Sequence, residues 1–284
     1  MKQLIYCKGV WHSWIKVGSN LGLWRADGAV EVLEARSDVL FHWDDHFERL
    51  GRSCRGYKNL DLSLLPSEEE ILAKTQSLLR KESLKEAIVH ILVTPGKSTD
   101  LKKAEGWPEL IIDVRSLNRP SSIPPLKLVT KNARRYFPEC KLTAGYGYVG
   151  RLQAEAEACG FDSFLYWDEY DGILEGPYEN FFVVTNSGWL CTPSINVLKG
   201  VTRKILLDLA KKHKVFESVD EVPRIRKGFL YECREAFLSS TTKGAAAIGE
   251  INGYHFNVGK DSKVEKLQEL FLEYRENYYK ARGA

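Results

Sequence analysis

The sequence has no long apolar segment and no large excess of charge of one sign. Its longest apolar runs, such as 163–167 and 245–248, fall far short of the ~18 residues that a membrane-spanning helix needs. Lys and Arg number 41 against 38 Asp and Glu, and this net charge of +3 does not favour a nucleic-acid partner. The 284 residues are 44% hydrophobic and 28% charged, which predicts a globular protein of one large or two ordinary domains.

Paired cysteines and histidine-based metal patterns are also missing. The six cysteines (7, 54, 140, 159, 191 and 233) form no Cys-x-x-Cys motif, so neither a zinc knuckle nor a thioredoxin-type site is supported. His42 and His46 are four residues apart, but the acids between them do not complete a catalytic metal pattern, and we expect no metal. Isolated thiols, and an N-terminus without a signal-peptide core, favour a reducing cytoplasmic location.

A proline-rich stretch at 117–125 is the best candidate for a domain boundary. It contains three of the ten prolines, and proline fixes φ and removes a backbone donor, which disfavours helices and central strands. We therefore expect a smaller N-terminal α/β domain at 1–116, a linker at 117–125 and a larger C-terminal domain at 126–284.

Hydrophobic spacing predicts strands interleaved with helices, which is typical of a mixed α/β fold. Ser67 and Glu70 form a predicted capping box, in which each side chain would bond the other residue's amide. Further helices are expected at 153–158, ending before Gly160, at 203–212, and at 262–282 as a docking helix. Expected strands are 29–33, 87–94, 110–114, 162–167 and 180–185, and 235–240 reads as a helix end turning into a strand.

Residues 145–150 match the Gly-x-Gly-x-x-Gly pattern of dinucleotide-binding folds. A predicted helix follows, and Asp168 lies about 20 residues further on, as that pattern requires. However, a strand should lead directly into the first glycine, whereas residues 134–144 contain a proline and several charged side chains. Nicotinamide binding is therefore a minor alternative.

Another set of residues fits together better. Lys141 precedes the glycine-rich turn, Glu175 lies between two predicted strands, residues 198–203 open a helix, and 238–242 are rich in hydroxyls. A helix N-terminus presents unpaired amides that suit a phosphate. A phosphate site, a lysine that can form an imine and an acid are what pyridoxal phosphate needs.

Four motifs in a fixed order strengthen this hypothesis. They are Asp-Gly-Ala-Val-Glu at 27–31, His-Phe-Glu-Arg-Leu at 46–50, Glu-Gly-Pro-Tyr-Glu-Asn-Phe-Phe at 175–182 and Leu-Lys-Gly-Val-Thr-Arg at 198–203. Over about residues 27–253 the chain resembles the class IV aminotransferases, which are fold-type IV pyridoxal-phosphate enzymes. The family includes branched-chain and D-amino acid aminotransferases and 4-amino-4-deoxychorismate lyases.

The resemblance implies a role for individual residues. Lys141 would bind the cofactor covalently and shuttle the proton, Glu175 would pair with the pyridine nitrogen, and Tyr146 would bond the ring hydroxyl. The resemblance implies that the remaining cofactor contacts are Arg49, Leu198, Val201, Thr202 and Thr241, and that Thr242 and Lys97 contact the substrate. It also implies a two-domain α/β (α+β) fold like that of D-amino acid aminotransferase, with the cofactor in the interdomain cleft, and a homodimer.

The expected reaction is transfer of an amino group between an amino acid and a 2-oxo acid. The main alternative is elimination of pyruvate from aminodeoxychorismate, and a non-catalytic ligand-binding relative is a further one. Glu31 favours transamination weakly, since some lyases have a threonine there. An arginine that binds the substrate carboxylate in D-amino acid enzymes is absent after the turn at 94–98, which leaves the substrate and its stereochemistry open. We expect small-molecule substrates and neither a nucleic-acid nor a membrane partner.

Overall fold

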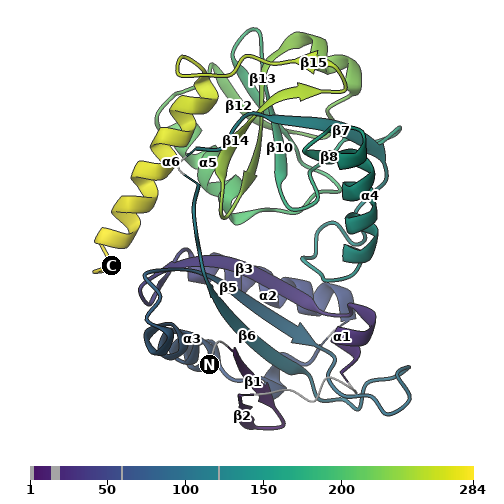
Figure 1. The fold of residues 1–284 in the computed structure, drawn as a ribbon, viewed down its shortest axis with the longest axis vertical. Coiled ribbons are helices and arrows are strands. Elements are labelled where there is room, and N and C mark those ends of the chain that lie inside the picture. Colours follow the sequence, from purple (N-terminus) through teal and green to yellow (C-terminus); the bar gives the residue numbers. More distant parts are fainter. Residues whose placement is uncertain (1–2, 14–19, 59, 121) are drawn as a thin grey trace. The chain divides into compact units, whose positions relative to one another are not determined.

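The computed structural model describes all residues except 1–2, 14–19, 59 and 121, and the chain divides into two compact units (Figure 1). Unit 1 comprises Met1–Arg119, Cys140–Tyr146 and Asn277–Ala284, and unit 2 comprises Pro120–Glu139 and Gly147–Glu276. The change of unit after Arg119 falls within the expected linker, of which residue 121 lies outside the described residues.

Each unit consists of more than one separate segment of the chain, whereas each expected domain was one continuous segment. The segment 140–146 belongs to unit 1 because its main chain bonds the start of a strand there. The Val30 amide donates to the Lys141 carbonyl at 2.9 Å, and the Thr143 amide donates to the Gly28 carbonyl at 2.9 Å. Lys141 is thus part of unit 1 although the chain around it belongs to unit 2.

Unit 1 contains a six-stranded antiparallel sheet with the order β2-β1-β6-β5-β3-β4. Its strands are β1 (Gln3–Cys7), β2 (Val10–His12), β3 (Ala29–Arg36), β4 (Val39–Leu40), β5 (Glu86–Thr94) and β6 (Glu109–Ser116). The helical elements of this unit are α1 (Leu21–Arg25), α2 (Trp43–Lys58), η2 (Leu62–Leu64) and α3 (Glu68–Glu82). The strands predicted at 29–33, 87–94 and 110–114 are confirmed and extend by a few residues.

The core of unit 1 lies between this sheet and the helices α2 and α3. Alternate residues of β5, from Ala87 to Val93, point into it, as period-two patterning requires. Ser67 caps α3 by accepting from the Glu70 amide at 3.3 Å, so half of the predicted capping box is confirmed. The other half is wrong, because the Glu70 carboxylate accepts from Trp11 Nε1 at 2.7 Å instead.

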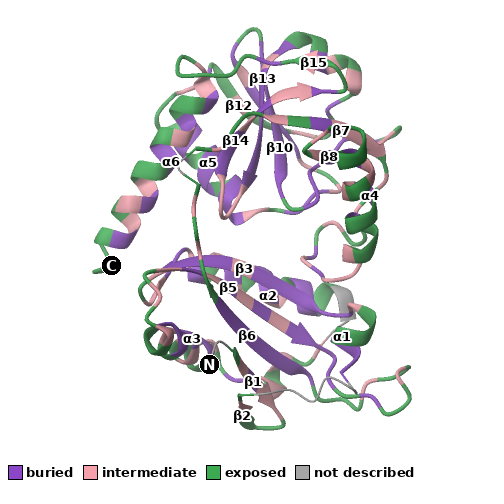
Figure 2. Cartoon of the chain, in the orientation of Figure 1, coloured by how far each residue is buried: buried purple, intermediate pink, exposed green. Residues whose placement is uncertain are grey.

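Unit 2 contains a nine-stranded mixed sheet with the order β12-β11-β10-β13-β14-β7-β8-β9, and β15 pairs with β14. Its strands are β7 (Leu126–Asn132), β8 (Ser163–Asp168), β9 (Gly172–Ile173), β10 (Asn180–Thr185), β11 (Trp189–Pro193), β12 (Ser218–Val222), β13 (Cys233–Ser240), β14 (Gly244–Ile251) and β15 (Tyr254–His255). Figure 2 shows that the central strands β10 and β13 are buried along most of their length.

The expectation of a helix end at 235–240 is wrong. These residues belong to β13, which pairs with β10 on one side and β14 on the other. A short apolar run is compatible with either a helix or a buried strand, and its position between two strands decides the matter here.

The helical elements of unit 2 agree better with the sequence patterns. They are α4 (Tyr146–Ala158), α5 (Val201–Lys212), η3 (Lys227–Glu232) and α6 (Lys263–Lys280), with the first residue of α4 and the last residues of α6 counted in unit 1. Gly160 follows α4 with φ +80°, as expected of a residue just beyond a helix end. Val264, Leu267 and Phe271 of α6 are buried, which confirms that this helix docks on the protein. Among the described residues, no helix combines the length and apolarity needed to cross a membrane.

Candidate active site

A buried ionic cluster in unit 1 links β3 with α2. Glu31 occurs on the same face of β3 as the core residues Ala29 and Leu33, so its carboxylate enters the core. Arg49 of α2 donates to both carboxylate oxygens, from Nε to Oε1 at 2.7 Å and from Nη2 to Oε2 at 2.6 Å. His46, one turn earlier, places Nδ1 2.8 Å from Oε2. All three residues are at most 4% exposed, so the negative charge of Glu31 compensates the buried guanidinium.

The cluster has a fixed charge distribution at neutral pH. Burial by itself would raise the pKa of Glu31, but the charge and hydrogen bonds of Arg49, aided by His46, outweigh it and lower the pKa from 4.5 to about 2. Burial lowers the pKa of His46 below 6.5; Glu31 opposes this change, and Arg49 and Lys141 add to it. Glu31 is therefore ionised and His46 neutral near pH 7.

Lys141 is held on the same framework as Arg49. Its amide donates to Ser53 Oγ at 3.0 Å, and the Ser53 hydroxyl donates to the Arg49 carbonyl at 2.9 Å. Its carbonyl accepts from Val30, the neighbour of Glu31 on β3. The main chain of Lys141 is thus fixed on both sides by the strand and helix that carry the ionic cluster.

Arg49 retains the capacity to bind an anion. Its Nε and Nη2 atoms are occupied by Glu31, whereas Nη1 has no hydrogen-bond partner among the residues that the structure describes. Because the Glu31 contact orients the planar guanidinium, Nη1 is presented in a fixed direction. This geometry fits a phosphate-binding arginine.

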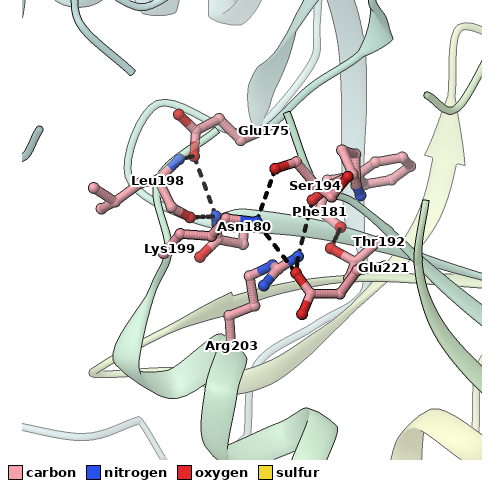
Figure 3. A network of polar contacts seen from close by, with 10 residues as sticks. Glu175, Asn180, Phe181, Thr192, Ser194, Leu198, Lys199, Arg203 and Glu221 are labelled. Atoms are coloured by element: carbon pink, nitrogen blue, oxygen red, sulfur yellow. Dashed lines mark hydrogen bonds and ion pairs between the residues drawn. The ribbon is translucent and has the colours of Figure 1, made fainter. Parts of the chain in front are cut away.

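In unit 2, Glu175 accepts from several N–H donors, of which those of Leu198 and Asn180 are drawn in Figure 3. Its Oε2 accepts from the Leu198 amide at 3.0 Å and from Asn180 Nδ2 at 3.2 Å, and Arg135 Nη1 lies 3.4 Å from Oε1. Glu175 itself is 2% exposed. Three donors directed at a buried carboxylate stabilise its charged form, as a partner for a protonated ring nitrogen requires.

Asn180 connects this acid to the loop before α5. Its Nδ2 also donates to the Leu198 carbonyl at 2.7 Å, so Leu198 bonds Glu175 and Asn180 through its two main-chain groups. A Cβ at Gly200 would lie 2.2 Å from Asn180 Oδ1. Glycine is therefore required where this loop passes Asn180, which explains part of the motif at 198–203.

The N-terminus of α5 is open to an anion. Gly200 is its N-cap and has no side chain that could bond the amides of the first turn, which include those of Val201 and Thr202. Arg203 is directed away from these amides toward β11 and β12, where Nη2 donates to the Pro193 carbonyl at 2.9 Å and to Glu221 Oε2 at 2.6 Å (Figure 3). The amides rather than the arginine thus fit a phosphate at this point.

The remaining predicted residues lie on loops and helix ends. Thr241 and Thr242 form the turn between β13 and β14, and Tyr146 is the first residue of α4. Lys97 follows β5 and has Nζ 3.8 Å from Glu105 Oε1. The structure brings Lys141 and Arg49 together within unit 1, and Glu175, Leu198 and the start of α5 together within unit 2.

Sequence reasoning assigned no role to Arg135 or Asn180. Asn180 lies in the motif at 175–182, but only its contacts show that it holds Glu175. Arg135 is 40 residues from Glu175 along the chain and comes after the end of β7. Two consecutive arginines, Arg134 and Arg135, lie shortly before Lys141 in the sequence and could have indicated a partner for an acid. However, pairs of charged residues are common on protein surfaces, so this signal is weak.

The structure does not support the dinucleotide pattern at 145–150. The strand before it, β7, ends at Asn132, and twelve residues separate it from Gly145. A dinucleotide fold needs the strand to enter the glycine turn directly. These glycines instead belong to the first turns of α4 and the residue before it.

Two solved structures, each named as an enzyme, have a similar fold. A branched-chain aminotransferase from Thermoproteus uzoniensis superposes with a TM-score of 0.82 at 22% identity, covering 96% of this chain and 94% of that one. A structure from Legionella pneumophila, named as a proposed 4-amino-4-deoxychorismate lyase, has a TM-score of 0.80 at 21% identity, with coverage of 92% and 96%. This likeness confirms the expected fold-type IV architecture.

Sequence comparison defines the family. A Methanocaldococcus jannaschii protein, named provisionally as a branched-chain-amino-acid aminotransferase, is 28% identical over 275 residues, covering 89% of each chain. The family model described as amino-transferase class IV matches residues 28–251. The match covers well over half of the sequence, so the chain belongs to the class IV aminotransferases.

Proposed function

We propose that this chain is a pyridoxal-phosphate-dependent aminotransferase that moves an amino group between an amino acid and a 2-oxo acid. The observation that carries the proposal is the chain of hydrogen bonds from Lys141 through Ser53 to Arg49. It holds a lysine at a fixed position relative to an arginine whose Nη1 is available to an anion. A cofactor that is both an aldehyde and a phosphate ester needs these two groups.

Each of these residues would have a distinct chemical role. When bound, pyridoxal phosphate would supply an electron sink for the electrons left when the Cα of an amino acid loses its proton. The Lys141 amine would take that proton and return it. Arg49 and the first amides of α5, including Val201 and Thr202, would hold the phosphate.

Glu175 would retain positive charge at the ring nitrogen, with Arg135 and Asn180 holding its carboxylate in place. This interaction is stronger after proton loss than before it, so it lowers the barrier rather than merely binding the cofactor. We assign Tyr146, Leu198 and Thr241 to the cofactor as well. Thr242 and Lys97 are the proposed substrate contacts.

Pyruvate elimination from aminodeoxychorismate is the second candidate. It is supported by the fold likeness to the Legionella pneumophila structure, which covers 96% of that chain. The same lysine and acid would serve both reactions, because both begin with proton loss at Cα. By family likeness we also propose a homodimer in the cytoplasm, which sedimentation and cell fractionation would test.

The test is a substrate panel with a matched variant. The purified 284-residue chain is incubated with L- and D-amino acids plus 2-oxoglutarate, and separately with aminodeoxychorismate, and the new amino acids, oxo acids and pyruvate are measured. Transamination is recognised by the formation of a new amino acid from the 2-oxo acid, whereas elimination gives pyruvate in the absence of any 2-oxo acid acceptor. Lys141→Ala should abolish turnover and the visible absorption band that borohydride removes, and Lys266→Ala, an exposed lysine of α6, should retain both. Full turnover by Lys141→Ala would overturn the proposal.

A further inference from the structure

A cavity of about 650 Å³ lies in unit 2, and none of the residues assigned above to catalysis or cofactor binding lines it. It is formed where β11 begins, β12 ends and η3 passes over them. The lining residues that matter here are Trp189, Val222, Arg224, Arg226, Phe229 and Glu232. Its size is within the range of about 300–1,000 Å³ that is typical of small-molecule sites.

The apolar walls of this cavity are fixed by the surrounding structure. Trp189 and Phe229 meet edge to face, with ring centroids 6.2 Å apart and planes at 79°. The Trp189 indole is oriented by a hydrogen bond from Nε1 to Asp220 Oδ2 at 2.7 Å. The segment after β12 that carries Arg224 and Arg226 is tied to β9. The carbonyl of the fully buried Ile225 between them accepts from the Ile173 amide at 2.7 Å.

The rim carries two positive groups and one negative group. Arg224, Arg226 and Glu232 are exposed, and none of their side chains has an ion pair or hydrogen bond to another residue within the described part of the chain. Elsewhere in unit 2, arginines such as Arg134 and Arg203 are paired with acids. The guanidinium groups at the rim are therefore available to a carboxylate, and Glu232 to an ammonium group.

We propose that this cavity binds a free apolar α-amino acid. Its carboxylate would bind the guanidinium groups of Arg224 and Arg226, its ammonium group would bind Glu232, and its side chain would lie between Trp189, Val222 and Phe229. An oxo acid lacks the ammonium group and would leave Glu232 without its contact to the ligand. An amino acid with a polar side chain would lose hydration at the aromatic walls without gaining hydrogen bonds.

The proposal does not rest on the proposed function, and its test keeps the two separate. The purified 284-residue chain is first treated with borohydride, which blocks a cofactor-bound Lys141, so that added amino acid cannot react there. L-leucine is then titrated by calorimetry, alongside leucinamide, N-acetyl-leucine and 4-methyl-2-oxopentanoate. If the purified protein contains no cofactor, borohydride does not alter Lys141, and the titration still measures leucine binding to the cavity.

We expect saturable one-to-one binding of L-leucine. Each analogue should bind at least roughly tenfold more weakly than L-leucine, because each lacks one charged contact. The double variant Arg224→Ala/Arg226→Ala should weaken leucine binding at least tenfold, and Glu232→Gln severalfold. Arg151→Ala removes an exposed arginine of α4 that does not line the cavity, and it should not change leucine binding. Circular dichroism spectra should be unchanged for all these variants, since the substituted side chains are on the surface.

Three results would overturn the proposal. They are no saturable leucine binding, equal binding of the oxo acid and leucine, and wild-type affinity in the double arginine variant. If sedimentation shows that the double variant changes the oligomeric state while leucine does not bind, the cavity is a contact between copies of the chain and the proposal is wrong.

Discussion

Replacing Glu31 with glutamine should destabilise unit 1 because it leaves a buried guanidinium without a counter-charge. Glutamine has nearly the same shape but is neutral, and its NH2 group replaces one of the two oxygens that accept from Arg49, so the charge and one of the parallel hydrogen bonds are lost together. Glu31 is 1% exposed and binds Arg49 through two hydrogen bonds of 2.7 and 2.6 Å. Breaking a buried ion pair in this way costs about 3–5 kcal/mol.

The pKa of Glu31 provides a second estimate of the same quantity. A pKa lowered from 4.5 to about 2 corresponds to about 3 kcal/mol of stability at neutral pH. Because the folded pKa is the lower one, this stability is present above about pH 4.5. It is lost as the pH falls through about 2, where the carboxylate of the folded protein takes up its proton.

The assay is urea unfolding of the wild-type and Glu31→Gln proteins at a series of pH values. We expect the free energies of unfolding to differ by about 3 kcal/mol at pH 7 and the difference to shrink below about pH 4.5. Glu155→Gln, the same change in an exposed ion pair of α4, should have little effect. A Glu31→Gln protein as stable as the wild type at pH 7, or a difference that does not vary with pH, would refute this explanation.

Three further changes test the candidate site. Glu175→Gln should lower kcat about 10²-fold, with little loss of cofactor, since charge at the ring nitrogen acts mainly after proton loss; steady-state kinetics and cofactor absorbance check this. Arg49→Lys retains a charge but cannot bind Glu31 through two parallel bonds, so cofactor affinity measured by dialysis should fall by ~1.5–3 kcal/mol. Gly200→Ala places a Cβ against Asn180 Oδ1, and unfolding should show a loss of about 1–3 kcal/mol.

Each of these variants has a matched control. Glu169→Gln alters an exposed acid just after β8 and should keep kcat. Arg52→Lys changes an exposed arginine on α2 and should keep cofactor affinity. Gly150→Ala adds a Cβ to open space on α4 and should not destabilise the protein. Equal effects in a variant and its control would remove the corresponding residue from the proposed site.

Much of the fold could be predicted because its signals are local. The strand predicted at 180–185 occurs at those residues, and Ser67 begins a helix, since a short run of aromatic and β-branched residues and a helix cap both depend on neighbouring residues. The segment 235–240 could not be assigned in this way. Its apolar run suits either state, and pairing with β10 and β14 makes it a strand.

The order of four motifs along the chain was enough to identify the family and to assign the catalytic and cofactor residues from Arg49 to Thr241, but not Arg135 or Asn180. Tertiary structure decided how those residues are held. Ser53 lies 88 positions from Lys141 and Arg135 lies 40 from Glu175, yet hydrogen bonds join both pairs. Chain spacing carries information over a few residues, whereas these contacts depend on which strands pair and which helices pack against them. The division of the lysine and the acid between two units follows from the same long-range pairing.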